Sequence, residues 1–432
     1  MPFVVKPRLF FAIEMWGTRC YMGVLEANYR GNQELYEPLW EDLYRESKSH
    51  GFRIRSIIIA DAAWQGQSGI MNADVVGNDR KLTIPHLQNL FLSRPLILLL
   101  SPSLSSHSLS LTHPQPILHP RLTPSTASWL DYTRDILQVV NHLRPPTPII
   151  GVAHSFGGAA ITNLAHFNPR LLTSLILLDP VISPYASTPG SLESSPAAHS
   201  LRRRETWPSR EEAAKSFAKS PFYKSWDPRV LNAWVTHGLT DVDSSGASKE
   251  VTLTTTKHQE VFTFLRPTWK AFDERGEQLV DRTRAPDLDL ENNFPVYPFC
   301  RPEPSLTLSR MRNIRPSVFY VLGEKSNLSH PPTIASRLRQ TGAGTGGSGG
   351  IQFGRVKQVM LPGLGHLVAM EAPGECARLG AEWIEKEVTR WREGEAREFE
   401  EWRGRRKEEK TMLTEEWAKY LKVQQRAPKA KI

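Results

Sequence analysis

Cysteine is scarce in this sequence of 432 residues, and long apolar runs are missing from it. The three cysteines, Cys20, Cys300 and Cys376, are too few and too far apart to predict a disulfide framework or a metal cluster. The longest apolar stretch, around residues 95–100, is far shorter than the roughly 18 residues of a membrane span. Residues 1–17 hold only a short apolar patch without a small-residue cleavage site after it. We therefore expect a protein of a reducing compartment, without a transmembrane segment or secretory signal.

Basic residues are in excess, but they are not clustered as in nucleic-acid-binding proteins. The formal net charge is +9. Acidic residues nevertheless alternate with basic ones in runs such as WRGRRKEEK, residues 402–410, whereas a nucleic-acid site needs uninterrupted basic clusters. With 40% hydrophobic and 23% charged residues, the composition is that of a globular protein with a sizeable core. We expect no nucleic-acid partner.

Helical and strand patterns alternate along much of the chain. Residues 33–51 have apolar side chains at helical spacing and end at a glycine, and residues 53–61 are a short β-branched run typical of a buried strand. The same order of helix and strand recurs at residues 129–155 and 161–180, and two more strands are predicted at residues 317–324 and 354–363. This alternation predicts an α/β fold with a mostly parallel sheet flanked by helices.

The predicted core comprises residues 25–180 and 316–390. Between its two parts, residues 181–315 are rich in Pro, Trp and Ser with short helical pieces, which predicts an inserted cap over the sheet. Residues 391–432 are expected to form a charged helical tail. The stretch TGAGTGGSGG, residues 341–350, is expected to be a flexible loop between elements.

Residues 80–127 do not fit this organisation, because they contain no Gly, Asp or Glu and many Ser, Leu, Pro and His. A structureless loop of that length is uncommon inside a compact domain. Codons for residues 80–82 can contain the splice donor GTAAG, and codons for residues 126–127 can contain the acceptor CAG. Removing the bases between them would join Asp79 to Ser128 through one proline codon, a natural helix start. We interpret the segment as a translated intron; the alternative is a genuine insertion loop.

The stretch GVAHSFGG, residues 151–158, places one serine between a β-branched run and small residues. On a sharp turn from strand to helix a serine hydroxyl projects above the sheet, and the residues two before and two after it must be small. Ala153, where glycine is usual, and Gly157 occupy these positions. We predict Ser155 as a nucleophile and the backbone N–H of Phe156 as an oxyanion donor. The alternative is a glycine-rich turn with an incidental serine.

A serine nucleophile needs a base, and the stretch LPGLGHLVAMEAP places His366 just after the last predicted strand. Serine first and histidine after the final strand is the required chain order. The acid is less clear, because the usual G-x-x-D site after the penultimate strand reads GEKS, residues 323–326. Two carboxylates are candidates: Asp179, at the end of the strand LILLDP, and Glu324.

Together these motifs resemble the α/β-hydrolase superfamily, and within it the fungal peroxisomal hydrolases of host-selective toxin clusters and, more loosely, the yeast peroxisomal lipase. The resemblance covers most of residues 27–385 and rests on ELYEPLW, ADAAWQGQSG, GND, SWLDYTRDILQVVNH, AHSFGG, LILLDPVI, GEKSNLS and PGLGHLVAMEAP. It implies an α/β-hydrolase fold and a serine hydrolase, similar to carboxylesterases and lipases, that cleaves an ester or thioester of a lipid or secondary metabolite. It implies no metal and no other cofactor. The family has a carboxylate at the LLDP position, which favours Asp179 over Glu324.

One stretch departs from the family pattern. The family has His-Ala-Asn-Gly after an early strand, where its backbone completes the oxyanion hole, and the matching residues here are Glu26, Ala27, Asn28 and Tyr29. A carboxylate beside a developing oxyanion is unfavourable. The chain before Glu26 also shows no clear series of strands, which we interpret as a misplaced start or exon in the gene. The alternative to an enzyme is therefore a catalytically impaired hydrolase-fold protein that binds a small molecule or a protein partner.

The last residues, KAKI, resemble a peroxisomal targeting signal of the small-basic-aliphatic kind, with Ile432 where leucine is usual. Ala430, Lys431 and Ile432 would bind the peroxisomal import receptor, presented by the charged tail before them. We expect a peroxisomal protein, with the cytoplasm as the alternative.

Overall fold

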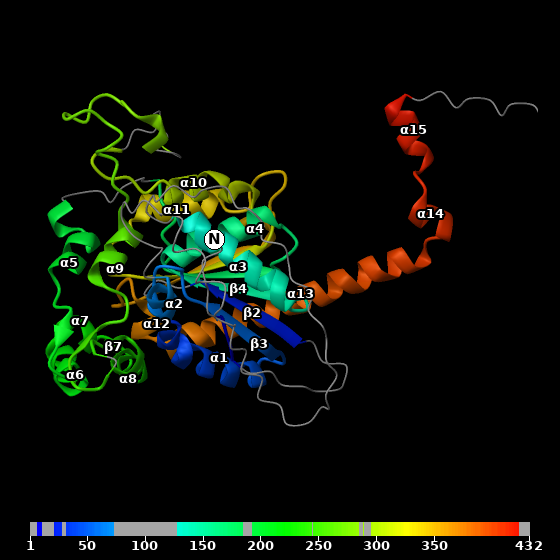
Figure 1. Ribbon diagram of the computed structural model, residues 1–432. Helices are drawn as coiled ribbons and strands as arrows, with labels where there is room; N and C mark the ends of the chain where they lie inside the picture. Colours follow the sequence, from blue (N-terminus) through cyan, green and yellow to red (C-terminus); the bar gives the residue numbers. More distant parts are fainter. Residues whose placement is uncertain are drawn as a thin grey trace, which may run out of the picture.

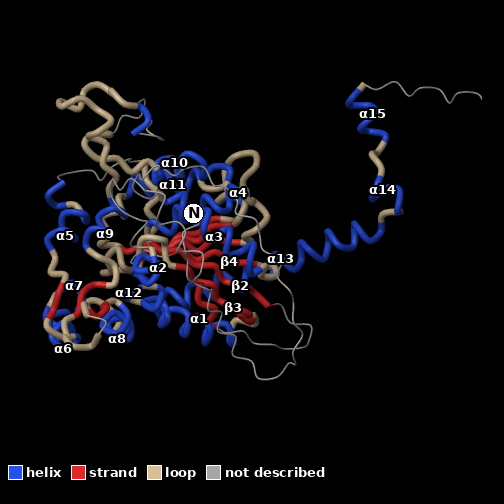
Figure 2. The backbone as a smooth tube through the Cα atoms, viewed as in Figure 1, coloured by secondary structure: helices blue, strands red, loops and turns tan. Residues whose placement is uncertain are grey.

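A twisted sheet forms the centre of the computed structural model, which describes residues 7–10, 21–27, 32–72, 128–184, 192–243, 245–284, 288 and 295–422 (Figures 1 and 2). The strand order is β1-β3-β2-β4-β5-β9-β10. All neighbours are parallel except β1, which is antiparallel to β3. The strands are β1 Pro7–Phe10, β2 Tyr21–Ala27, β3 Arg53–Ala60, β4 Ile149–His154, β5 Ser174–Leu178, β9 Ser317–Gly323 and β10 Val356–Leu361. The predicted α/β fold with a mostly parallel sheet is confirmed.

Helices cover both faces of this sheet (Figure 1). On one face α1 and α13 pack against each other and on the strands, while α3, α4, α10 and α11 lie on the other face. The helices of the core are α1 Glu37–Ser49, α2 Gly66–Met71, α3 Trp129–Leu143, α4 Phe156–Phe167, α10 Glu303–Arg310, α11 Pro331–Gln340, α12 Val368–Glu371 and α13 Pro373–Gly404. The crossover helices between parallel strands account for this three-layer arrangement.

Helix α3 begins directly after the segment that we interpret as an intron. The Ser128 side chain accepts a hydrogen bond from the backbone N–H of Leu130, and the Asp131 carboxylate accepts one from the N–H of Ser128. This cap satisfies N–H groups that a helix start leaves without partners. Residues 80–127 themselves lie outside the described residues.

A mixed insert lies between β5 and β9 and contacts the core at the carboxyl ends of the strands. Its elements are α5 Pro196–Arg202, α6 Arg210–Lys219, α7 Pro221–Lys224, α8 Pro228–His237, α9 Lys257–Phe264 and a small antiparallel sheet of β6 Thr206–Trp207, β8 Val251–Leu253 and β7 Leu239–Asp241. Arg229 of α8 forms a two-pronged ion pair with Asp42 of α1, at 2.9 and 2.7 Å. Thr263 of α9 accepts hydrogen bonds from the side chains of Trp64 and Gln65, which follow β3. The insert is therefore anchored on α1 and on the loop after β3.

The N-terminal part of the chain corrects one expectation, because β1 and β2 lie where no clear series of strands was predicted. The sequence of β2, YMGVLEA, contains a glycine and a glutamate that break the apolar pattern of a buried strand. It is nevertheless an internal strand of the sheet, because its backbone pairs with β3 on one side and with β4 on the other. Its position inside the sheet depends on these distant partners rather than on local pattern.

The glycine-rich loop before β10 also differs from expectation, because it is packed rather than free. Backbone N–H groups of Gly342, Gly344 and Ser348 donate to carbonyls of residues 311–314, at 2.6 to 2.9 Å. A Cβ atom at Gly347 would lie 2.6 Å from the carbonyl oxygen of Arg312. The glycines are thus needed for close backbone approach, a role that composition does not distinguish from flexibility.

The C-terminal helices leave the body of the molecule (Figure 1). One side of α13 is buried from Pro373 as far as Val388, and the rest of the helix projects outward toward α14, Lys407–Thr411, and α15, Glu415–Leu421. Of the described helices, none has both the length and the apolar character to cross a bilayer. The expected targeting residues Ala430, Lys431 and Ile432 lie outside the described residues.

Candidate active site

Ser155 lies on a sharp turn between β4 and α4. Its backbone has φ 56° and ψ −124°, a conformation that side-chain-bearing residues seldom adopt. Hydrogen bonds hold the turn: the Ser155 N–H donates to the carbonyl of Leu178 on β5, and the Ser155 carbonyl accepts from Gly158 and Val181, all at 3.0 Å. The serine is therefore fixed at the carboxyl end of the central strands, in the strained geometry typical of a nucleophile turn.

The structure brings Ser155, His366 and Asp179 into one hydrogen-bonded chain. His366 Nε2 lies 2.8 Å from Ser155 Oγ, and His366 Nδ1 lies 2.6 Å from Asp179 Oδ2. A carboxylate only accepts hydrogen bonds, so Nδ1 carries the ring proton. In the neutral imidazole Nε2 is then left as an acceptor that faces the serine hydroxyl. This arrangement can take a proton from Ser155.

Asp179 is fully buried and receives two further hydrogen bonds. Ser326 Oγ donates to Asp179 Oδ2 at 2.5 Å, and the N–H of Gly323 donates to Oδ1 at 3.4 Å. The sequence showed only that residues 323–326 lack the usual acid, and the support that Ser326 gives to the carboxylate after the neighbouring strand was not predicted. The G-x-x-S pattern at the usual position of the acid was the available signal.

Gly323 also lets the histidine loop, residues 362–367 between β10 and α12, approach the end of β9. A Cβ atom there would lie 1.9 Å from the carbonyl oxygen of Gly365, the residue before His366. No side chain fits in that space, because non-bonded carbon and oxygen atoms do not approach so closely. The glycine therefore sets how near His366 lies to Asp179.

Glu324, the alternative acid, is not placed against the His366 ring. Its Oε2 accepts the backbone N–H of Gly363 at 2.7 Å. Both ring nitrogens of His366 are already engaged, by Asp179 and by Ser155. Glu324 thus holds the loop that carries the histidine.

A buried arginine lies behind the acid. Arg337 of α11 donates to the carbonyls of Pro180 and Ile182, at 3.4 and 3.3 Å, and its guanidinium lies 4.9 Å from the centre of the Tyr320 ring. Burial lowers the pKa of Arg337, and the nearby Tyr320 and Asp179 oppose this shift. This residue was not predicted as part of the site, because an arginine on a helix is usually exposed.

Of the four predicted oxyanion residues, Phe156 and Ala27 lie within the described part of the chain. Phe156 is the first residue of α4, where backbone N–H groups have no acceptor within the helix. Its ring is buried and packs on Trp129, Tyr132 and Trp64, with centroids 5.4, 5.9 and 6.3 Å away. Ala27 ends β2 and is in register with Ala153 of β4. The predicted residues Asn28 and Tyr29 lie outside the described residues.

The sequence matches the alpha/beta hydrolase family over residues 81–379. The chain belongs to this family. A protein of Penicillium roqueforti (strain FM164) named Type I acyl-CoA thioesterase mpaH is 32% identical over 411 residues, which cover 90% of this chain and 82% of that protein. The Abhydrolase domain-containing protein AFT2-1 of Alternaria alternata is 30% identical over 278 residues, which cover 63% of this chain and 97% of that protein.

Among solved structures, the peroxisomal alpha-beta-hydrolase Lpx1 of Saccharomyces cerevisiae is similar to this hydrolase with a TM-score of 0.55. The two sequences are 13% identical, and the match covers 89% of each chain. At that identity the likeness concerns the fold alone. The predicted α/β-hydrolase fold is confirmed, as is the resemblance to fungal hydrolases and to the yeast peroxisomal enzyme.

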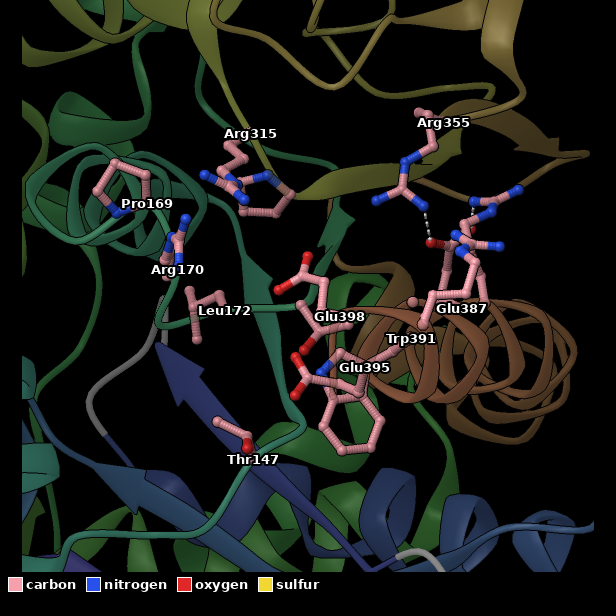
Figure 3. Close-up of a pocket in the computed structure, with 15 residues that line it drawn as sticks. Thr147, Pro169, Arg170, Leu172, Arg315, Arg355, Glu387, Trp391, Glu395 and Glu398 are labelled. Carbon is pink, nitrogen blue, oxygen red and sulfur yellow. Dashed lines mark hydrogen bonds and ion pairs between the residues drawn. The ribbon is translucent and has the colours of Figure 1, made fainter. Parts of the chain in front are cut away.

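A pocket of about 340 Å³ lies at the amino ends of the strands in this α/β-hydrolase (Figure 3). Six of its lining residues precede β4, β5, β9 and β10 by one or two positions: Thr147, Leu172, Thr173, Arg315, Pro316 and Arg355. Ser155 and Asp179 follow the carboxyl ends of β4 and β5 instead. The pocket is therefore separated from the candidate active site by the length of the strands.

The two thiols that the structure describes in this hydrolase are not arranged for chemistry. Cys300 and Cys376 are buried and free, and Cys20 lies outside the described residues. Burial raises the pKa of Cys300 to about 11 and that of Cys376 still further. Thiols held in the protonated form are poor nucleophiles. In the part of the chain that the structure describes, no three His, Cys, Asp or Glu side chains are grouped to hold a metal ion.

Proposed function

We propose that this hydrolase cleaves an acyl ester or thioester through a covalent acyl-enzyme on Ser155. The observation that carries the proposal is the chain of contacts from Ser155 through His366 to Asp179, at 2.8 and 2.6 Å. A serine hydroxyl becomes an effective nucleophile when a correctly oriented base takes its proton. Membership of a hydrolase family and the required chain order of these residues give further support.

In the first half of the reaction, Ser155 Oγ attacks the carbonyl carbon of the substrate while His366 Nε2 takes the hydroxyl proton. The tetrahedral intermediate collapses when the bond to the leaving group breaks, and His366 returns the proton to the departing oxygen or sulfur. In the second half, His366 takes a proton from water, the hydroxide attacks the acyl carbon, and Ser155 leaves with the proton. Asp179 stays ionised and keeps the Nδ1 proton of His366 in place.

The oxyanion would be held by backbone donors. The N–H of Phe156 stands at the start of α4, where the helix dipole favours negative charge. Ala27 ends β2, the strand beside the nucleophile strand β4, and Asn28 and Tyr29 come next in the sequence. We propose that this segment supplies the second donor.

The substrate class follows from the relatives rather than from a described cavity. The Penicillium roqueforti relative covers 90% of this chain and is named an acyl-CoA thioesterase. A thioester carbonyl is attacked by the same serine, and its thiolate leaves more readily than an alkoxide. We therefore propose an acyl thioester as the first substrate to test, with lipid and secondary-metabolite esters as the second.

The experiment compares matched acyl-CoA thioesters and aryl esters with the purified full chain. Release of free thiol or phenol is followed, with the Ser155→Ala variant as the control for background hydrolysis. Hydrolysis by the wild type at a rate at least about 10³-fold above the variant supports the proposal. Equal rates for the two proteins would contradict it and favour the noncatalytic binding protein.

We also propose delivery to peroxisomes through Ala430, Lys431 and Ile432. The resemblance of these residues to a targeting tripeptide supports this. A fluorescent protein fused to the N-terminus should colocalise with a peroxisomal marker in fungal cells, and removal of the three residues should make it cytoplasmic. A diffuse signal from the full chain would contradict the proposal.

A further inference from the structure

A second buried histidine contacts the backbone of His366. His154 ends β4, directly before Ser155, and its side chain is fully buried. Its Nε2 lies 2.9 Å from the carbonyl oxygen of His366, and its Nδ1 lies 2.8 Å from the hydroxyl of Tyr36. The two imidazole rings are 5.3 Å apart between centroids. His154 therefore links the strand of the nucleophile to the loop of the base.

The partners of His154 fix its tautomer. A carbonyl oxygen only accepts hydrogen bonds, so Nε2 carries the proton and donates to His366. In the neutral ring Nδ1 then accepts, and the buried Tyr36 hydroxyl donates to it. Both polar atoms of a fully buried ring are thus satisfied, which holds the ring in one orientation.

Each of residues 363–366 in the histidine loop forms a hydrogen bond that anchors the loop. Gly363 donates to Glu324, Leu364 accepts from Lys325, Gly365 donates to Glu371, and the carbonyl of His366 accepts from His154. Leu367, one residue later, is the N-cap of α12, and its carbonyl accepts hydrogen bonds from the N–H groups of Met370 and Glu371. The bond from His154 is thus the anchor at the proposed base itself.

We infer that His154, oriented by Tyr36, is a positioning residue for His366, an inference that rests on the proposed hydrolysis. The His366 side chain must reach Ser155 and Asp179 at once, at 2.8 and 2.6 Å. Because the histidine side chain has a fixed length, the position of the His366 backbone relative to the sheet determines whether both contacts form. A misplacement of about 1 Å in a reacting group can reduce the rate roughly 10²-fold.

Two amide variants separate the two contacts of His154. In His154→Gln the side-chain amide can occupy the place of Nε2 and donate to the carbonyl of His366. In His154→Asn the shorter amide can meet only Tyr36 and leaves that carbonyl without its donor. Both variants put a polar amide in the same buried site, so general destabilisation affects them alike. His142→Asn, at an exposed position of α3, controls for the loss of a histidine elsewhere.

We expect kcat to fall about 30- to 100-fold in His154→Asn and less than about tenfold in His154→Gln, with KM within threefold of wild type in both. The order should be the same for the rate of labelling by a fluorophosphonate probe. A shift of the pH profile of kcat/KM is expected in His154→Asn only, because the environment of the His366 ring changes there. Equal kcat in the two variants, or a lower kcat in His154→Gln, would overturn the inference.

Tyr36→Phe tests the same inference if an amide variant does not fold. It removes one hydroxyl and leaves the aromatic packing, so we expect a kcat about three- to tenfold below wild type, the loss of one hydrogen bond. A wild-type kcat in a folded Tyr36→Phe variant would contradict the role of Tyr36. Failure of the proposed function is distinguishable, because the wild type itself would then not be labelled and would not turn over substrate.

Discussion

Replacing Asp179 by Asn removes a charge from a buried site at which three donors converge. The donors are His366 Nδ1–H at 2.6 Å, Ser326 Oγ–H at 2.5 Å and the Gly323 N–H at 3.4 Å. A carboxylate accepts on both oxygens, whereas an amide has one accepting oxygen and one donating NH₂ group. In the variant, therefore, the amide NH₂ group, itself a donor, faces either His366 Nδ1–H or the Gly323 N–H.

The two orientations of the amide bracket the expected loss. With the amide oxygen toward His366 the geometry survives, but the imidazolium formed during the reaction loses its ionic partner, which costs about 1.5–3 kcal/mol or roughly 10- to 150-fold in rate. With the NH₂ group toward His366, Nδ1 must accept and Nε2 holds the proton, so the base cannot act and the loss approaches about 10⁴-fold. We expect kcat of Asp179→Asn to fall between these limits.

Glu324→Gln is the matched control for this change. The amide oxygen can still accept the N–H of Gly363, so we expect kcat/KM within about fivefold of wild type. Hydrolysis rates and fluorophosphonate labelling rates are measured for both variants, with thermal unfolding as the check on folding. A larger loss in Glu324→Gln than in Asp179→Asn would refute the assignment of the acid.

Three further predictions concern the packing and the extent of the chain. Gly323→Ala should lower kcat about 10²-fold, measured by hydrolysis, because its Cβ would displace Gly365 and the loop behind it; unchanged kcat would contradict the fit of that loop. Burial raises the pKa of Asp135 from 3.8 to about 6, so the folded chain binds a proton more tightly there than the unfolded chain does. The free energy of unfolding should therefore decline by about 2 kcal/mol from pH 4 to pH 6, and denaturant titrations should show a smaller decline in Asp135→Asn. Transcripts should join Asp79 to Ser128 through one proline codon; transcripts that always retain the segment would make it a genuine insertion.

The strands around Ser155 could be predicted because each is a short, continuous apolar run. All residues of β4 and β5 are buried, and such runs read as strands without reference to their partners. The sequence of β2 has no such run, so its place between β3 and β4 follows only from the assembled sheet. The local sequence pattern therefore predicts the buried strands β4 and β5, but it does not predict β2, whose position depends on pairing with distant strands.

The candidate site divides in the same way. Ser155 and Asp179 each follow a strand, and the carboxyl ends of parallel strands meet at one edge, so their closeness could be anticipated. The contact from Ser326 to Asp179 depends on how the loop after β9 turns, and the contact from His154 depends on the height of the histidine loop. Such supporting contacts join residues more than a hundred positions apart and leave no mark in the local sequence.

An activated serine reacts with a fluorophosphonate, so labelling by this probe tests whether Ser155 is the nucleophile. The purified full chain is treated with the probe, digested, and the modified peptide identified by mass spectrometry. We expect one modified serine, Ser155, in the wild type and no labelling in the folded Ser155→Ala variant. An unlabelled wild type, or labelling that persists in Ser155→Ala, would contradict it.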